Sequence, residues 1–103
     1  MKRGEGLERV ERDILAEKAA ALGRAGERLE QALAEAARLG LCYDAATDPD
    51  ERERLGRAYE RARGVAVGAR LALLIQREAV GLRNHRIVDQ QFPEPPPLRA
   101  RRR

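Results

Sequence analysis

Residues 48–83 read DPDERERLGRAYERARGVAVGARLALLIQREAVGLR, and this stretch decides the fold. Asp48 can accept a hydrogen bond from the free amide of Glu51, and Pro49 suits the first turn of a helix. Acidic residues in that turn complement the positive end of the helix dipole. Apolar residues then recur at helical spacing as far as about Arg83. The stretch therefore predicts one long helix with a well-defined start.

A second long helix is predicted before it. Between residues 7 and 39 apolar residues recur at helical spacing, with Glu and Arg between them. Gly40 is suited to end this helix, because a residue without a Cβ readily takes the left-handed conformation that closes helices. A loop of residues 41–47 would join two helices of nearly equal length, which predicts an antiparallel hairpin.

The composition also indicates an all-α fold. Of 103 residues, 37% are charged and only 3% are aromatic. Ala, Leu, Glu and Arg dominate, as they do in long helices, whereas β-branched and aromatic residues are too few for a sheet protein. Eighteen of the hydrophobic residues are alanine, which leaves a thin core for a monomer.

The rest of the chain divides into a short segment and a tail. After Asn84 the sequence HRIVDQQF can form an extra turn or a short helix. The prolines of residues 93–97 exclude a helix there, and LRARRR follows them. We therefore expect a helical hairpin domain of residues 1–92 and a Pro-rich basic tail of residues 93–103.

Four glycines predict a close helix crossing. Pairing the two helices about their loop places Gly23 and Gly26 near Gly64 and Gly68. Glycine costs about 1 kcal/mol in a helix interior, and a close approach of the two backbones would account for it. The alternative is that these glycines lie on a solvated face.

The segment 65–75 is apolar on two opposite sides. One side carries Val65, Ala69, Ala72 and Leu73, and the other carries Val67, Leu71, Leu74 and Ile75. A two-helix hairpin can cover only one of them. A homodimeric four-helix bundle is the simplest way to cover the second, because a two-fold dimer buries the same patch twice. Alternatively Ile87, Val88 and Phe92 fold back over it, which predicts a monomer.

No arrangement of residues indicates an enzyme, a metal site or a cofactor. The seventeen acidic residues alternate with arginine, as is typical of solvated helix faces. His85 is the only histidine and the chain contains no serine, so neither a catalytic triad nor a di-metal motif can be assembled. Cys42 stands beside Asp44, which disfavours a reactive thiol. We therefore expect a non-enzymatic protein without a cofactor.

We expect an interaction or structural module that forms a homodimer or docks on a protein partner. The expected contact residues are the second apolar side and polar positions after it: Val67, Leu71, Leu74, Ile75, Gln76, Arg83 and His85. Gln76 interrupts the seam, and such a residue can set register or oligomeric state. A weaker alternative is an accessory subunit that docks on a larger enzyme.

The basic tail suggests a different function. A stiff proline segment would project Arg99, Arg101, Arg102 and Arg103 away from the helices. These arginines can contact phosphates, but specific recognition needs a positioned helix or stacking aromatics, and only Phe92 is nearby. The alternative function is weak, nonspecific association with nucleic acid.

The sequence predicts a cytoplasmic location and no membrane partner. No apolar leader segment follows Met1, and a single cysteine cannot close an intramolecular disulfide. The longest apolar run, residues 64–75, contains Arg70 and is shorter than the roughly 20 residues that span a bilayer.

The chain contains the stretches LAEKAAALGRAGERLEQAL at residues 15–33 and QREAVGLRNHRIVDQQF at residues 76–92. With them it resembles a family of small bacterial α-helical proteins of unknown function. The resemblance covers most of the chain apart from the loop and the tail. It implies no activity and no site residues, and the arginine-rich tail departs from the family pattern.

Overall fold

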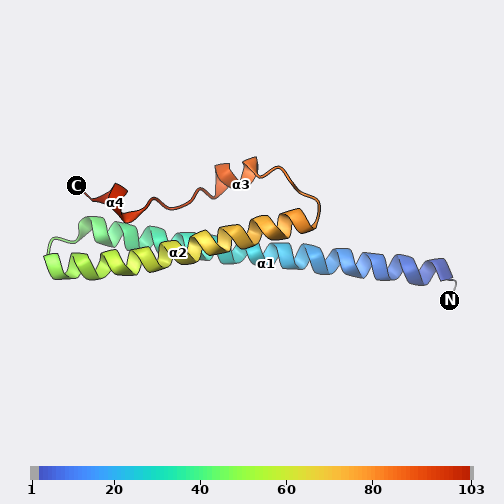
Figure 1. The fold of residues 1–103 in the computed structure, drawn as a ribbon. Helices are drawn as coiled ribbons and strands as arrows, with labels where there is room; N and C mark the ends of the chain where they lie inside the picture. Colours follow the sequence, from blue (N-terminus) through green and yellow to red (C-terminus); the bar gives the residue numbers. More distant parts are fainter. Residues whose placement is uncertain (1–2, 103) are drawn as a thin grey trace.

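The chain folds into a helical hairpin against which its C-terminal segment packs (Figure 1). The computed structural model describes residues 3–102. This part of the chain holds four helices and no strand: α1 (Arg3–Ala45), α2 (Pro49–Ala79), α3 (Arg86–Gln91) and α4 (Leu98–Arg101). Because α1 and α2 pack against each other in antiparallel directions, the prediction of an all-α hairpin is confirmed.

Both ends of α2 have a defined local cause. At its start the Asp48 carboxylate accepts a hydrogen bond of 2.9 Å from the amide of Glu51, as predicted. At its end the amide of Leu82 donates to the carbonyl of Arg77 and that of Gly81 donates to Glu78. These two bonds form a Schellman motif, which needs the left-handed φ of 89° at Gly81. The helix therefore ends at Ala79, before the predicted limit near Arg83.

The predicted end of α1 at Gly40 is wrong, because the helix continues to Ala45. The residues 41–45 that extend the helix beyond Gly40 bring Tyr43 into the core, where only 5% of it stays exposed. Burial of an aromatic side chain outweighs the cost of one glycine in a helix interior. The loop shrinks to residues 46–48, and the pairing of the helices shifts accordingly.

The core consists of two clusters, one toward each end of the hairpin. The cluster near the open end contains Ala25, Leu29, Leu73 and Val88. The cluster near the loop contains Ala36, Tyr43, Tyr59 and Leu98. Each cluster takes one residue from the C-terminal segment, so this segment completes the core at both places.

The prediction that the basic tail projects away from the helices is wrong. Leu98 of α4 is buried against the loop end of the hairpin. The alternative in which the C-terminal segment folds back is correct for Val88, which is buried, and for Phe92, which packs on the same cluster. Ile87, in contrast, remains 50% exposed. The C-terminal segment thus belongs to the folded unit.

The predicted glycine crossing is also wrong. A Cβ placed on Gly23, Gly26, Gly64 or Gly68 would meet no atom within 4 Å. The longer α1 shifts the helix register, so that Gly56 lies against Tyr43. A Cβ on Gly56 would lie 3.3 Å from Cε2 of Tyr43 and 3.2 Å from Cδ2 of Leu98. The close contacts therefore occur near the loop.

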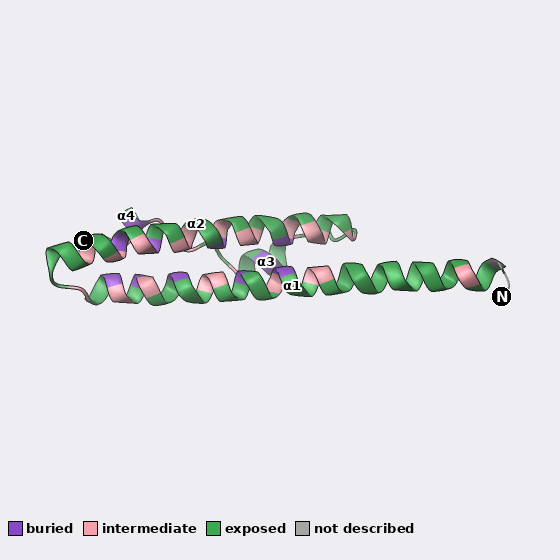
Figure 2. Cartoon of the chain, turned by 90° about the horizontal axis from the view of Figure 1, so that it is seen from below, coloured by how far each residue is buried: buried purple, intermediate pink, exposed green. Residues whose placement is uncertain are grey.

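The first turns of α1 extend beyond the hairpin. α2 ends before it can cover them, and every residue from Leu7 to Ala20 is exposed (Figure 2). We call residues 3–20 the overhang. It gives the molecule a rod shape of 71 × 23 × 14 Å with one closed end, at the loop, and one open end.

Candidate interaction surface

The second apolar side of α2 is divided by the C-terminal segment. Leu74 packs against the core cluster that contains Val88, and Val67 is half-buried. Leu71 and Ile75 stay exposed, at 58% and 57%. α3 therefore covers part of the predicted contact side and leaves two large apolar residues in solvent.

The overhang exposes more apolar surface at the same end of the molecule. Its large apolar residues are 44 to 65% exposed: Leu7, Val10, Ile14 and Leu15. Leu15, Leu22 and Leu29 are seven residues apart, so they lie on one line along α1. Leu29 is buried against α2 and Leu22 packs beside it, whereas Leu15 has no such cover. The overhang thus continues the face that packs against α2.

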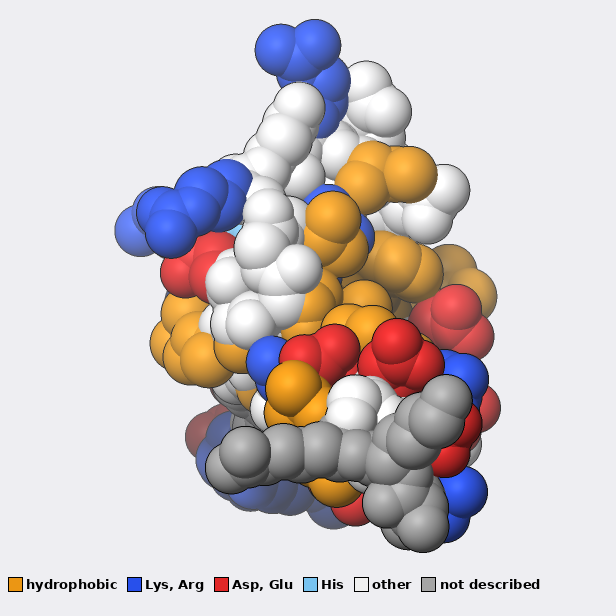
Figure 3. Space-filling view, turned by 90° about the vertical axis from the view of Figure 1, so that its right-hand side faces the viewer, with side chains coloured by type: hydrophobic (Ala, Val, Ile, Leu, Met, Phe, Trp, Pro, Cys, Tyr) orange, Lys and Arg blue, Asp and Glu red, His pale blue; other side chains and the backbone are white. Residues whose placement is uncertain are grey.

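Charged side chains lie among these apolar residues. Figure 3, which looks at the open end, shows hydrophobic side chains interspersed with acidic and basic ones. Exposed apolar side chains gathered among charged ones are typical of protein interaction sites.

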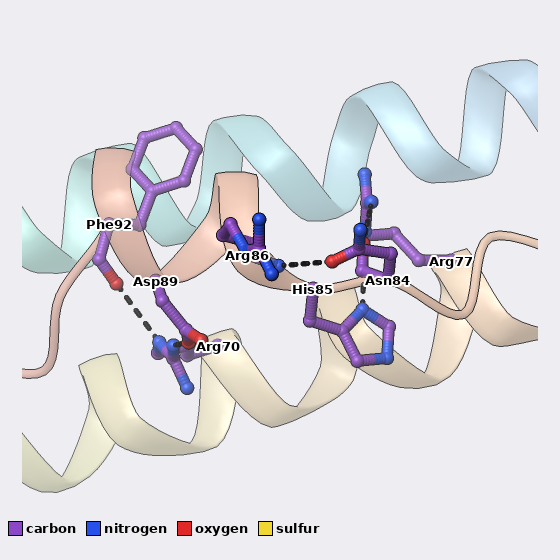
Figure 4. A network of polar contacts seen from close by, with 7 residues as sticks. All are labelled: Arg70, Arg77, Asn84, His85, Arg86, Asp89 and Phe92. Atoms are coloured by element: carbon purple, nitrogen blue, oxygen red, sulfur yellow. Dashed lines mark hydrogen bonds and ion pairs between the residues drawn. The ribbon is translucent and has the colours of Figure 1, made fainter.

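Of the predicted polar contact residues, His85 helps to fix the turn after α2 (Figure 4). Nε2 of His85 lies 3.0 Å from Oε1 of Glu78, and Arg77 donates to Nδ1 of His85 and to the carbonyl of Asn84. Gln76 is half-buried and Arg83 is exposed outside this network. The structure brings His85 together with Arg77 and Glu78, but not with Arg83.

Polar side chains of α2 that the sequence reasoning missed hold the C-terminal segment. Arg70 donates to the carbonyl of Phe92 and pairs with Asp89. Arg63 donates to the carbonyl of Pro95, and the Tyr59 hydroxyl donates to that of Pro96. The signal for this role was Arg70, a charge inside an otherwise apolar run. Prolines lack the N–H that regular helix or sheet bonding needs, so the carbonyls of a proline segment need donors from elsewhere, such as these side chains.

The tail arginines are not equivalent. Arg101 is largely covered: its Nη2 lies 3.3 Å from Oδ2 of Asp44, and its guanidinium carbon lies 5.0 Å from the ring centroid of Tyr59. Arg99 and Arg102 are exposed, and Arg103 lies outside the described residues. Arg101, one of the four arginines predicted to contact nucleic acid, therefore contacts the folded chain instead.

Exposed ion pairs also lie along the helices. Arg38 donates to Glu35, and this hydrogen bond lowers the pKa of the Glu35 carboxyl below its usual value. Glu51 pairs with Arg54 and Glu53 with Arg57 in the same way. Such pairs contribute little to stability.

Comparisons with known proteins assign this chain to no family. Known protein families, curated proteins and solved structures gave no match to this chain. Between residues 3 and 102 no three His, Cys, Asp or Glu side chains are grouped as they would be around a metal ion. None of the described helices is long and apolar enough to cross a membrane.

Proposed function

We propose that the chain is a non-enzymatic helical interaction module that self-associates through its open end. The observation that carries the proposal is the overhang, in which Leu7, Ile14 and Leu15 continue the packing face of α1 without a cover. A helical segment such as the overhang, which packs against no other element, is only marginally stable in water by itself. Burial of its apolar stripe would stabilise both the helix and the assembly.

A second copy of the chain is the partner that fits this surface. In an antiparallel arrangement the overhang of the second copy takes the position that a longer α2 would occupy. Leu7 then faces Ile14 and Leu15 of the second copy, and Glu8 lies beside its Arg12. A two-fold axis repeats each of these contacts.

The exposed pair Leu71 and Ile75 offers a second contact at the same end. These two residues are what remains of the apolar side expected to form a four-helix bundle. They lie on α2, so their contribution can be separated from that of the overhang. A different protein docked on the open end would use the same residues but would leave the isolated chain monomeric.

Sedimentation equilibrium tests the proposal. We expect the wild-type chain to associate at tens of micromolar, and the double variant Leu7→Glu/Ile14→Glu to be monomeric. Leu71→Glu/Ile75→Glu measures the contribution of α2. Leu41→Glu is a matched control, because Leu41 is also exposed but lies near the loop. A monomeric wild type, or equal association of all variants, would refute self-association.

A further inference from the structure

The closed end of the hairpin carries an open groove of about 720 Å³. Three segments line it: the end of α1 with Tyr43, the first turns of α2 with Arg52 and Arg61, and the chain after α4 with Arg102. The groove lies at the opposite end of the rod from the overhang. An inference about it therefore does not rest on self-association.

Positive charge in the groove exceeds negative charge. Two carboxylates line it, and both have partners: Glu53 pairs with Arg57 at 3.0 Å, and Glu60 accepts a 2.7 Å bond from the amide of Leu98. Within residues 3–102, no carboxylate pairs with Arg52, Arg61 or Arg102. Four arginines and two glutamates thus line one solvent-open groove, which leaves it with an excess of two positive charges, and Arg52, Arg61 and Arg102 are the arginines without an ion pair there.

Tyr43 gives the groove a fixed floor. Its side chain is buried in the loop-end cluster, beside Gly56 and with Leu98. The guanidinium carbon of Arg52 lies 4.3 Å from the centroid of its ring, a distance suited to a cation–π contact. Arg52 is thereby held in place over a rigid ring, which lowers the entropic cost of binding a ligand.

These arginines also act on the ionisation of the Tyr43 hydroxyl. Hydrogen bonding from Arg52, with a smaller contribution from Arg102, lowers the pKa of Tyr43 below its usual value although burial acts in the opposite direction. The groove therefore favours negative charge at the position of the phenol oxygen.

We propose that this groove binds phosphate groups, held by Arg52, Arg61 and Arg102 above Tyr43. The planar guanidinium fork donates two parallel hydrogen bonds to phosphate oxygens, and three forks suit a ligand with several negative charges. A chain of linked phosphates meets this requirement better than a single carboxylate. Its source is either a small polyphosphate or the backbone of a nucleic acid.

Calorimetric titration of the full chain with tripolyphosphate at physiological salt tests the proposal. We expect saturable binding that Arg61→Gln and Arg102→Gln each weaken by about tenfold, since each removes a charge-assisted contact. Both residues are exposed, so both variants should keep the wild-type helical circular dichroism. Arg54→Gln is the matched control, because Arg54 also lies on α2 but pairs with Glu51 and does not line the groove.

A second ligand separates the two sources. A single-stranded oligonucleotide that binds with the same dependence on Arg61 and Arg102, while tripolyphosphate binds weakly, would assign the groove to a nucleic-acid backbone. The converse result would assign it to small polyphosphates. Absence of binding by both ligands, or equal losses in Arg54→Gln and Arg61→Gln, would overturn the proposal.

Discussion

The guanidinium group of Arg101 occupies the space that a side chain on Gly40 would fill. A Cβ at position 40 would lie only 2.8 Å from Nε of Arg101. The same guanidinium contacts the Tyr59 ring and the Asp44 carboxylate. The glycine that the sequence predicted as a helix end is therefore one of the positions on α1 against which the C-terminal segment packs.

Gly40→Ala should change stability in a way that depends on Arg101. In an Arg101→Ala background the substitution should stabilise the protein by up to about 1 kcal/mol, because alanine favours the helix. In the wild type this gain should be cancelled, since the methyl group displaces Arg101 from Tyr59 and Asp44. Urea unfolding of the four proteins measures the coupling, which we expect to be about 1 kcal/mol. Equal effects in both backgrounds would contradict the contact.

Gly64→Ala and Gly81→Ala should have opposite effects. A Cβ on Gly64 meets no atom within 4 Å, so the alanine should raise the melting temperature through its helix propensity. Gly81 has a φ of 89°, which alanine adopts only with strain, so the same substitution should destabilise the protein by about 1 kcal/mol. Thermal unfolding measures both. A lower melting temperature for Gly64→Ala would indicate that the helices do approach closely at Gly64, as the sequence predicted.

Tyr43 should ionise at lower pH than an ordinary tyrosine. Its pKa is lowered mainly by hydrogen bonding from Arg52, so Arg52→Gln should raise the pKa toward the usual 10.0. NMR of the Tyr43 ring across an alkaline titration measures this, and Arg54→Gln should leave the titration unchanged.

The lowered pKa of Tyr43 also makes the free energy of unfolding depend on pH, in a direction that can be predicted. Between the lowered pKa of folded Tyr43 and the usual value in the unfolded chain, the unfolded state binds more protons. The contribution of Tyr43 to the free energy of unfolding should therefore grow as pH rises through this window, and be lost as pH falls through the folded pKa. A contribution that falls with rising pH in the wild type, relative to Arg52→Gln, would refute the assigned cause.

Glu11→Leu should strengthen self-association. Glu11 lies about five helical turns before the buried Leu29, in the middle of the exposed stripe. In a two-fold pairing of overhangs it faces the same carboxylate of the second copy, so leucine would remove repulsion and add apolar contact. We expect the dissociation constant to fall about tenfold or more. Asp13→Leu, on the opposite side of α1, is the matched control, and equal effects would contradict the pairing.

The sequence predicted the features that depend on local chemistry. The Asp48 cap, the start of α2, the hairpin and the short helix after His85 needed only nearby residues. The ends at Gly40 and Arg83 were misplaced because burial of Tyr43 in one case, and a Schellman motif at Gly81 in the other, outweighed the simpler signals. The longer α1 also displaced the register on which the glycine crossing depended.

Part of the candidate surface was also predictable from the local pattern of the sequence. Helical periodicity placed Leu71 and Ile75 outside the hairpin, and they are exposed. It could not show that Leu74 lies beneath α3, because this depends on contacts between distant segments. Leu98 was missed because one leucine among arginines resembles a disordered tail, and the role of Arg101 depends on the position of Gly40.

The length of the rod has a hydrodynamic consequence. A compact chain of this length has a radius of gyration of about 13 Å, whereas the value here is 19.4 Å. By the same scaling, that radius belongs to a compact protein about three times as long. A single copy will thus elute from a sieving column much earlier than its 11.5 kDa would suggest. A mass derived from the elution volume with globular standards would therefore overestimate the number of copies in the assembly. A method that measures mass independently of molecular shape gives the correct number.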